Sequence, residues 1–172
     1  MPLEPLPTAD LSDAAGEPIA MDPRIRPVWR GARLAGPAFT VRTPPGEHIS
    51  VRQSLERAQP GDVIVIDGGA DLRRALWGDK LSKLALERGI AGLVVDGAVR
   101  DVAEIERLGF PVFAIAAVPT PPVRTVEGET GVGIECGGLR VAPGDLVFGD
   151  ADGVVVVPSE RAGEILQSAR TS

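Results

Sequence analysis

Two short stretches of the chain combine residue types that can do chemistry on an anionic substrate, Gly78-Asp79-Lys80-Leu81 and Arg100-Asp101. Gly78 allows a ligand to approach the backbone closely, and N–H groups at the start of the helix expected after it favour an anion. An arginine holds a carboxylate or an enolate oxygen through two parallel hydrogen bonds. An aspartate is a hard oxygen ligand for Mg²⁺ or Mn²⁺, ions that usually keep most of their waters.

Each stretch also has a plainer interpretation. Asp79 can be a helix-terminal charge after an ordinary glycine turn, and Asp101 can be a helix N-cap with a solvated Arg100 beside it. Taken singly, the plainer interpretations are favoured. Together the two stretches favour chemistry on a 2-oxo acid, because a metal chelated by the substrate's carboxylate and keto oxygen is an electron sink for an enolate. Breaking a carbon–carbon bond then requires no lysine Schiff base.

The supply of other reactive side chains is small, with one histidine, one cysteine and no tyrosine. Within one chain this excludes an HExxH zinc site, a four-cysteine zinc site, a site of two cysteines and two histidines, and an internal disulfide. A Ser-His-Asp triad would have to use His48, which we interpret as a surface or capping residue at a helix start. We interpret Cys136 as a small hydrophobic residue of a sheet.

The charge balance is acidic, with 18 Lys and Arg against 24 Asp and Glu and a net charge of −6. The basic residues are dispersed, so we expect no nucleic-acid partner. No apolar stretch approaches the ~18 residues of a membrane span, and residues 1–5 do not begin a signal peptide. One free cysteine fits a reducing compartment. The sequence therefore predicts a cytoplasmic protein that does not associate with membranes.

The strands and helices that must position the two stretches can be predicted because Gly, Pro and Asp residues mark their ends. Short apolar runs between these residues predict strands buried on both faces, and helical patterns alternate with the first of them. Strands are expected at 39–41, 63–66, 93–95 and 112–115, and helices at 49–58, 79–88 and 102–108. This is the rhythm of a parallel sheet, in which ligands bind beyond the carboxyl ends of the strands.

After Pro122 short strands follow one another without helices, at 131–136, 139–141, 146–148 and 154–157. Thr8 is expected to cap a first helix at 9–15, and Ser159 a last helix at 160–168. We predict a single α/β domain over residues 1–172 with a β-rich C-terminal half. It comprises an N-terminal helix and a proline-rich extended arm (1–35), an α/β core (36–158) and a C-terminal helix (159–172).

At these residues the chain closely resembles the RraA-like family. That family contains metal-dependent 4-hydroxy-4-methyl-2-oxoglutarate aldolases, oxaloacetate decarboxylases and a ribonuclease-regulating protein. The resemblance covers nearly the whole chain, and the Gly-Asp and Asp-Gly-x-x-Arg-Asp motifs are specific in this order. The segments that carry it are TADLSDA (8–14), GPAFTV (36–41), PGDV (60–63), WGD (77–79), DGAVRD (96–101), PGDLV (143–147) and GDADGV (149–154).

The resemblance implies an α/β/β layered fold, like that of phosphohistidine or swivelling domains, assembled as a homotrimer or a dimer of trimers. It places the site at a subunit boundary and implies that the backbone of Gly78, Asp79, Lys80 and Leu81 holds the carboxylate of a small 2-oxo acid. Arg100 matches the arginine that steadies the enolate. Asp101 matches the one protein ligand of a divalent metal cation, Mg²⁺ or Mn²⁺. Asp79 matches the acid that holds a water which protonates the enolate.

The implied function is that of a divalent-metal-dependent class II lyase. It would cleave 4-hydroxy-4-methyl-2-oxoglutarate-type 2-oxo acids to pyruvate, decarboxylate oxaloacetate, or both. The alternative is a non-enzymatic regulator that binds and inhibits a ribonuclease, but regulators in the family generally lack the aspartate that follows the arginine, and this chain keeps Asp101. Family aldolases also take an acid from the neighbouring subunit, and here neither Glu160 nor Glu164 is matched to it. A methyltransferase is disfavoured, since no glycine-rich nucleotide loop follows the first strand.

Overall fold

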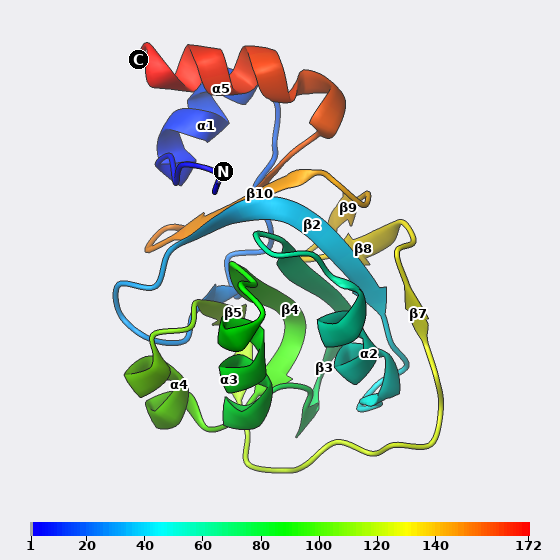
Figure 1. Cartoon of the computed structure of the whole chain (residues 1–172). Coiled ribbons are helices and arrows are strands. Elements are labelled where there is room, and N and C mark those ends of the chain that lie inside the picture. Colours follow the sequence, from blue (N-terminus) through cyan, green and yellow to red (C-terminus); the bar gives the residue numbers. More distant parts are fainter. Residues whose placement is uncertain (1) are drawn as a thin grey trace.

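The sheet is built around four parallel strands in the spatial order β5-β4-β3-β2. The computed structural model describes residues 2–172 and shows a mixed α/β domain, as predicted (Figure 1). The residues predicted as central strands, 63–66 and 93–95, are fully buried because the sheet is covered on both faces. The parallel strands are β2 (Leu34–Arg42), β3 (Val63–Ala75), β4 (Gly92–Val99) and β5 (Val112–Ala114).

Three helices connect these strands, as the alternating pattern predicts. They are α2 (Ile49–Arg57), α3 (Asp79–Glu87) and α4 (Val102–Leu108). Gly89 and Gly109 follow the ends of α3 and α4 with φ of 73° and 72°, the left-handed conformation that glycine adopts at helix ends without strain. One core lies between these helices and the sheet, around Ile64, Leu93 and Phe110.

Short antiparallel strands extend the sheet beyond both edges of the parallel set. β10 (Leu146–Asp150) pairs with β2, and β11 (Gly153–Val157) pairs with β10. The remaining short strands are β1 (Arg26–Pro27) beside β5, β6 (Ala116–Ala117) beside β4, β7 (Glu129–Thr130) beside β2, and the separate hairpin of β8 (Ile134–Cys136) and β9 (Leu139–Val141).

The proline-rich segment 18–27, predicted to be an extended arm, is extended but packs on its own sheet. The Met21 N–H donates to the Val154 carbonyl in β11 at 2.9 Å, and the Ile19 carbonyl accepts from the Val156 N–H. A few residues later, Arg26 and Pro27 pair with β5 at the opposite edge. One segment therefore bridges the two edges, and the sheet becomes nearly closed and barrel-like. The predicted likeness to phosphohistidine and swivelling domains stays a prediction.

The two terminal helices pack together on the far side of β10 and β11 (Figure 1). These are α1 (Thr8–Ala15) and α5 (Ala162–Arg170). The predictions for their first residues were wrong. Thr8 lies within α1 and is held by Asp150, whose Oδ2 accepts from its N–H at 2.9 Å. Ser159 begins a short 3₁₀ turn (Ser159–Arg161), and α5 starts after that turn. Among residues 2–172, no helix is long and apolar enough to cross a membrane.

Candidate active site

The two predicted stretches meet because β3 runs further than its apolar core. The sequence predicts a strand at 63–66, but β3 continues with two register shifts to Ala75, which pairs with Ala98 of β4. The pairing then passes into the loops, where the Leu76 N–H donates to the Ala98 carbonyl and the Arg100 N–H to the Trp77 carbonyl, both at 2.9 Å. These backbone bonds fix Gly78–Leu81 beside Arg100-Asp101.

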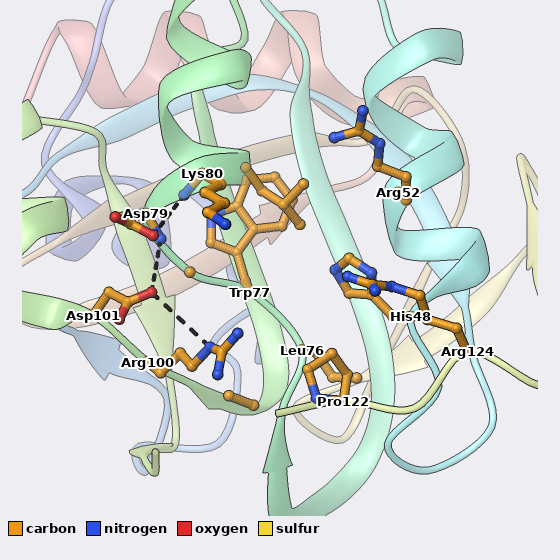
Figure 2. A pocket seen from close by; sticks show the side chains of 13 residues that line it. His48, Arg52, Leu76, Trp77, Asp79, Lys80, Arg100, Asp101, Pro122 and Arg124 are labelled. Atoms are coloured by element: carbon orange, nitrogen blue, oxygen red, sulfur yellow. Dashed lines mark hydrogen bonds and ion pairs between the residues drawn. The ribbon is translucent and has the colours of Figure 1, made fainter. Parts of the chain in front are cut away.

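A cavity of about 260 Å³ opens at this junction (Figure 2). This volume lies below the ~300–1,000 Å³ of typical pockets for drug-sized ligands, so the cavity suits a small metabolite. All six residues predicted to form the site line it. The complete lining is His48, Arg52, Ala75, Leu76, Trp77, Gly78, Asp79, Lys80, Leu81, Arg100, Asp101, Pro122 and Arg124.

Asp101 has an unusual backbone conformation for a residue that precedes a helix. It occupies the N-cap position of α4, as the plainer interpretation expects, but its side chain makes no capping hydrogen bond there. Its φ of 60° and ψ of 37° are left-handed, a state that costs a non-glycine residue ~1 kcal/mol or more. The carboxylate instead turns to the facing loop, where Oδ2 accepts from the Asp79 N–H at 3.2 Å.

Gly78 makes room for that carboxylate. A Cβ atom at position 78 would lie 2.6 Å from Asp101 Oδ2, closer than real side-chain contacts allow. The sequence predicted that Gly78 lets a ligand approach the backbone closely. In the structure the Asp101 carboxylate makes this close approach. At the start of α3 the Lys80 N–H also donates to Asp79 Oδ1, at 2.8 Å. Two amides of this turn thus already bind carboxylate oxygens, as expected of a helix N-terminus.

Ser82, which was not predicted from the sequence, holds the same turn in place through two hydrogen bonds. It is fully buried; its Oγ accepts from Trp77 Nε1 at 2.8 Å and donates to the Gly78 carbonyl at 2.9 Å. Trp77 is 2% exposed and stacks on Phe110. A serine on the buried face of a predicted helix, three residues after the Gly-Asp pair, was the available signal.

Arg100 lies half-buried between the carboxylate side of the cavity and the following loop. Its Nε is 4.0 Å from Asp101 Oδ2, and its Nη1 donates to the Pro119 carbonyl at 3.5 Å. Both contacts are long, so the guanidinium keeps donors for a ligand. Lys80 is an exposed residue that lines the same side of the cavity (Figure 2).

The opposite wall was not predicted from the sequence. His48 is 7% exposed and lines the cavity, so its interpretation as a surface residue was wrong; it occupies the N-cap position of α2 but makes no side-chain capping hydrogen bond. Burial, followed by the charges of Arg124, Arg52 and Arg100, lowers its pKa to about 4. The imidazole is therefore neutral at pH 7. Arg52 on α2 and Arg124 on the loop after Pro122 complete this wall (Figure 2).

Two other aspartates, which follow the apolar runs of β3 and β4, form hydrogen bonds outside the cavity. The Asp96 carboxylate accepts from the Gly137 N–H at 3.0 Å, and that of Asp67 from the Gly69 N–H at 3.1 Å. Neither lines the cavity. Cys136 is fully buried in β8, which confirms its interpretation as a small hydrophobic residue.

A model of the RraA-like family, described as Aldolase/RraA, matches residues 8–156. The chain belongs to the RraA-like family. A Halalkalibacterium halodurans relative with the printed name "putative 4-hydroxy-4-methyl-2-oxoglutarate aldolase" is 40% identical over 165 residues, which cover 96% of this chain and 79% of the relative.

Solved structures that are similar to this chain carry different names. One from Thermus thermophilus, described as the RNA-processing inhibitor RraA, aligns with a TM-score of 0.82 at 36% identity and covers 91% of this chain and 94% of that one. One from Geobacillus kaustophilus, described as an S-adenosylmethionine:2-dimethylmenaquinone methyltransferase, also has a TM-score of 0.82, at 38% identity, with coverage of 89% and 95%. The shared fold therefore does not select among these activities, and the site must.

The donor set of this RraA-like site suits a hard divalent cation and not a closed zinc centre. Residues 2–172 contain no group of three or more His, Cys, Asp or Glu side chains that could hold a metal. The Asp101 carboxylate, however, is 39% exposed at the cavity, and Asp79 supplies a second carboxylate beside it. Mg²⁺ is usually bound through one or two carboxylates, with substrate and water as the other ligands.

Proposed function

We propose that this protein is a divalent-metal-dependent class II lyase that forms pyruvate from small 2-oxo acids. It would cleave 4-hydroxy-4-methyl-2-oxoglutarate, decarboxylate oxaloacetate, or both. The observation that carries the proposal is the convergence of Arg100, Asp101 and the N-terminus of α3 on one small cavity. The names of relatives such as the H. halodurans protein support the same activity.

The residues divide the work by their chemistry. Arg100, together with backbone amides of Gly78 to Leu81, binds the carboxylate and keto end of the substrate and stabilises charge that develops on the keto oxygen. Asp101 would hold a Mg²⁺ or Mn²⁺ ion, which supplies Lewis-acid stabilisation of an enolate. Asp79 would hold a water that protonates the enolate. Because Arg100 and Asp101 are adjacent, substrate and metal would share one rigid turn.

The direct test incubates the purified protein with 4-hydroxy-4-methyl-2-oxoglutarate or with oxaloacetate and follows pyruvate. Each substrate is tried with Mg²⁺, with Mn²⁺ and with EDTA, beside metal-only blanks because oxaloacetate decarboxylates slowly by itself. Metal-dependent pyruvate above the blank is expected with at least one substrate. Absence of pyruvate with both substrates and both metals would refute the proposal.

A second candidate function is inhibition of a ribonuclease through protein–protein contact. It is favoured by the likeness to the Thermus structure described as an RNA-processing inhibitor. The net charge of −6 would suit a basic partner segment. This function needs neither the metal nor Asp101, so a ribonuclease assay with wild-type protein and with Asp101→Asn separates the two. Equal inhibition by both proteins, without pyruvate formation, would establish the second function.

A further inference from the structure

The cavity is positively charged within an acidic protein. Its lining includes four cationic side chains, Arg52, Lys80, Arg100 and Arg124, against the two carboxylates of Asp79 and Asp101, a formal sum of 4 − 2 = +2. The chain as a whole carries −6. A concave site of one sign concentrates ligands of the opposite sign. A divalent cation held by Asp101 would make the cavity more positive still, because the one carboxylate neutralises only part of the charge of the ion.

The charges are also sorted across the cavity (Figure 2). Both carboxylates lie on the side of α3 and the β4 end, with Arg100 and Lys80. Arg52, Arg124 and the neutral His48 lie on the opposite side, across from Asp79 and Asp101, and the apolar side chains of Trp77 and Leu76 also line the cavity. Within residues 2–172, neither Arg52 nor Arg124 has a carboxylate within the 4.0 Å of an ion pair, whereas Arg42, Arg107 and Arg161 do.

The position of Arg124 is set by a buried glutamate. Glu47, 5% exposed, accepts hydrogen bonds from the N–H groups of Thr125 and Val126 at 2.9 and 3.0 Å, and another from the Thr125 hydroxyl. The backbone adds two more bonds, from the His48 N–H to the Val123 carbonyl and from the Val123 N–H to the Gly46 carbonyl, both 2.9 Å. The residues on both sides of Arg124 are therefore anchored to the segment that carries His48.

We propose that Arg124 and Arg52 form a subsite for a second carboxylate of the substrate, at the end remote from the 2-oxo group, and that Glu47 is its positioning residue. The inference rests on the proposed function, since Arg100 and Asp101 fix which end of the substrate lies where. Two arginines that have no carboxylate partner within residues 2–172 can bind an anion that is separated from the first carboxylate by a short carbon chain. 4-Hydroxy-4-methyl-2-oxoglutarate carries such a second carboxylate, and these side chains would set the preference for it over a 2-oxo monocarboxylate.

The test uses two uncleavable probes of equal chain length, 2-oxoglutarate and 2-oxopentanoate, which differ in the distal carboxylate. Their binding to the wild-type protein with Mg²⁺ is measured by calorimetry. We expect 2-oxoglutarate to bind about tenfold more tightly or better, since its distal carboxylate gains charge-assisted hydrogen bonds. Arg124→Met and Arg52→Met should each lose most of this preference while the affinity for 2-oxopentanoate stays within about twofold.

Two further variants sharpen the measurement. Arg140→Met makes the same change on the exposed face of β9, away from the cavity, and should leave both affinities unaltered. Glu47→Gln should weaken 2-oxoglutarate alone, whereas general damage to the fold would weaken both probes, and Glu47→Asp should restore part of the preference.

The possible failures have different meanings. If wild-type protein binds both probes equally, or if Arg124→Met and Arg52→Met keep the wild-type preference, the distal subsite is refuted and the proposed lyase function stands. If wild-type protein binds neither probe with Mg²⁺, the 2-oxo acid site is itself refuted and the subsite with it.

Discussion

The carboxylate of Asp101 accepts a hydrogen bond from the backbone N–H of Asp79, with an Oδ2–N distance of 3.2 Å across 22 residues of sequence. This bond joins the candidate metal ligand to the candidate anion-binding turn. It forms because β3 and β4 pair as far as Ala75 and Ala98, and because position 78 has no side chain. The metal and substrate halves of the site should therefore respond together when either is disturbed.

Gly78→Ala is expected to abolish most activity while the protein stays folded. The new Cβ would lie 2.6 Å from Asp101 Oδ2 and displace the carboxylate, and a displacement of about 1 Å costs ~100-fold in rate. The φ of −152° at Gly78 suits alanine, so no backbone strain adds to the effect. Pyruvate formation measures the rate, and circular dichroism the fold.

The matched control is Gly163→Ala in α5, where an added Cβ meets nothing within 4 Å. Alanine in a helix is favoured over glycine by ~0.5–1 kcal/mol, so this variant should be slightly more stable and fully active. Retention of wild-type activity by Gly78→Ala would show that the close approach of Asp101 has no function.

Ser82→Ala should lower both stability and activity. It removes the acceptor for Trp77 Nε1 and the donor to the Gly78 carbonyl, and it leaves a buried N–H without a partner. We expect a loss of ~1–3 kcal/mol in the free energy of unfolding, measured by urea titration. Ser168→Ala, on the exposed face of α5, is the comparison and should change stability by under ~0.5 kcal/mol. Equal stabilities for the two variants would show that the two Ser82 hydrogen bonds do not stabilise this turn.

Stability should fall in acid partly through His48. Its pKa is about 4 in the folded chain against its usual 6.5, so the unfolded chain binds the proton first as the pH falls. The contribution is fully present above pH ~6.5 and is lost on the way to pH ~4, at a cost of about 3 kcal/mol. His48→Gln should flatten this part of the unfolding free energy against pH. An unchanged slope in that variant would contradict the lowered pKa.

The sequence was sufficient for one half of the site because the signals there are local. Apolar runs ending in Asp67 and Asp96 predict adjacent parallel strands, and adjacent strands bring their following loops together. The sequence alone could therefore place Gly78, Asp79 and Arg100-Asp101 at the carboxyl-end edge of the sheet. The left-handed backbone of Asp101 could not, because aspartate before a helix ordinarily signals an N-cap.

The other half was missed because it depends on contacts between distant segments. Arg52 belongs to the polar face of α2, and Arg124 to an irregular stretch between β6 and β7, where neither periodicity nor a motif marks it. The bonds that bring Arg124 to the cavity join Glu47 to Thr125 across 78 residues. A buried glutamate acting as a loop anchor has no signature distinct from that of a surface glutamate.

The central claim, that Asp101 serves a metal-dependent lyase, is tested most directly by comparing wild type, Asp101→Asn and the exposed control Asp152→Asn. Mn²⁺ binding is followed by electron paramagnetic resonance and pyruvate formation by a coupled assay, on the same samples. We predict that Asp101→Asn weakens Mn²⁺ binding at least about tenfold and slows pyruvate formation about 100-fold or more, while Asp152→Asn matches wild type. Wild-type Mn²⁺ affinity and undiminished pyruvate formation in Asp101→Asn would contradict the account.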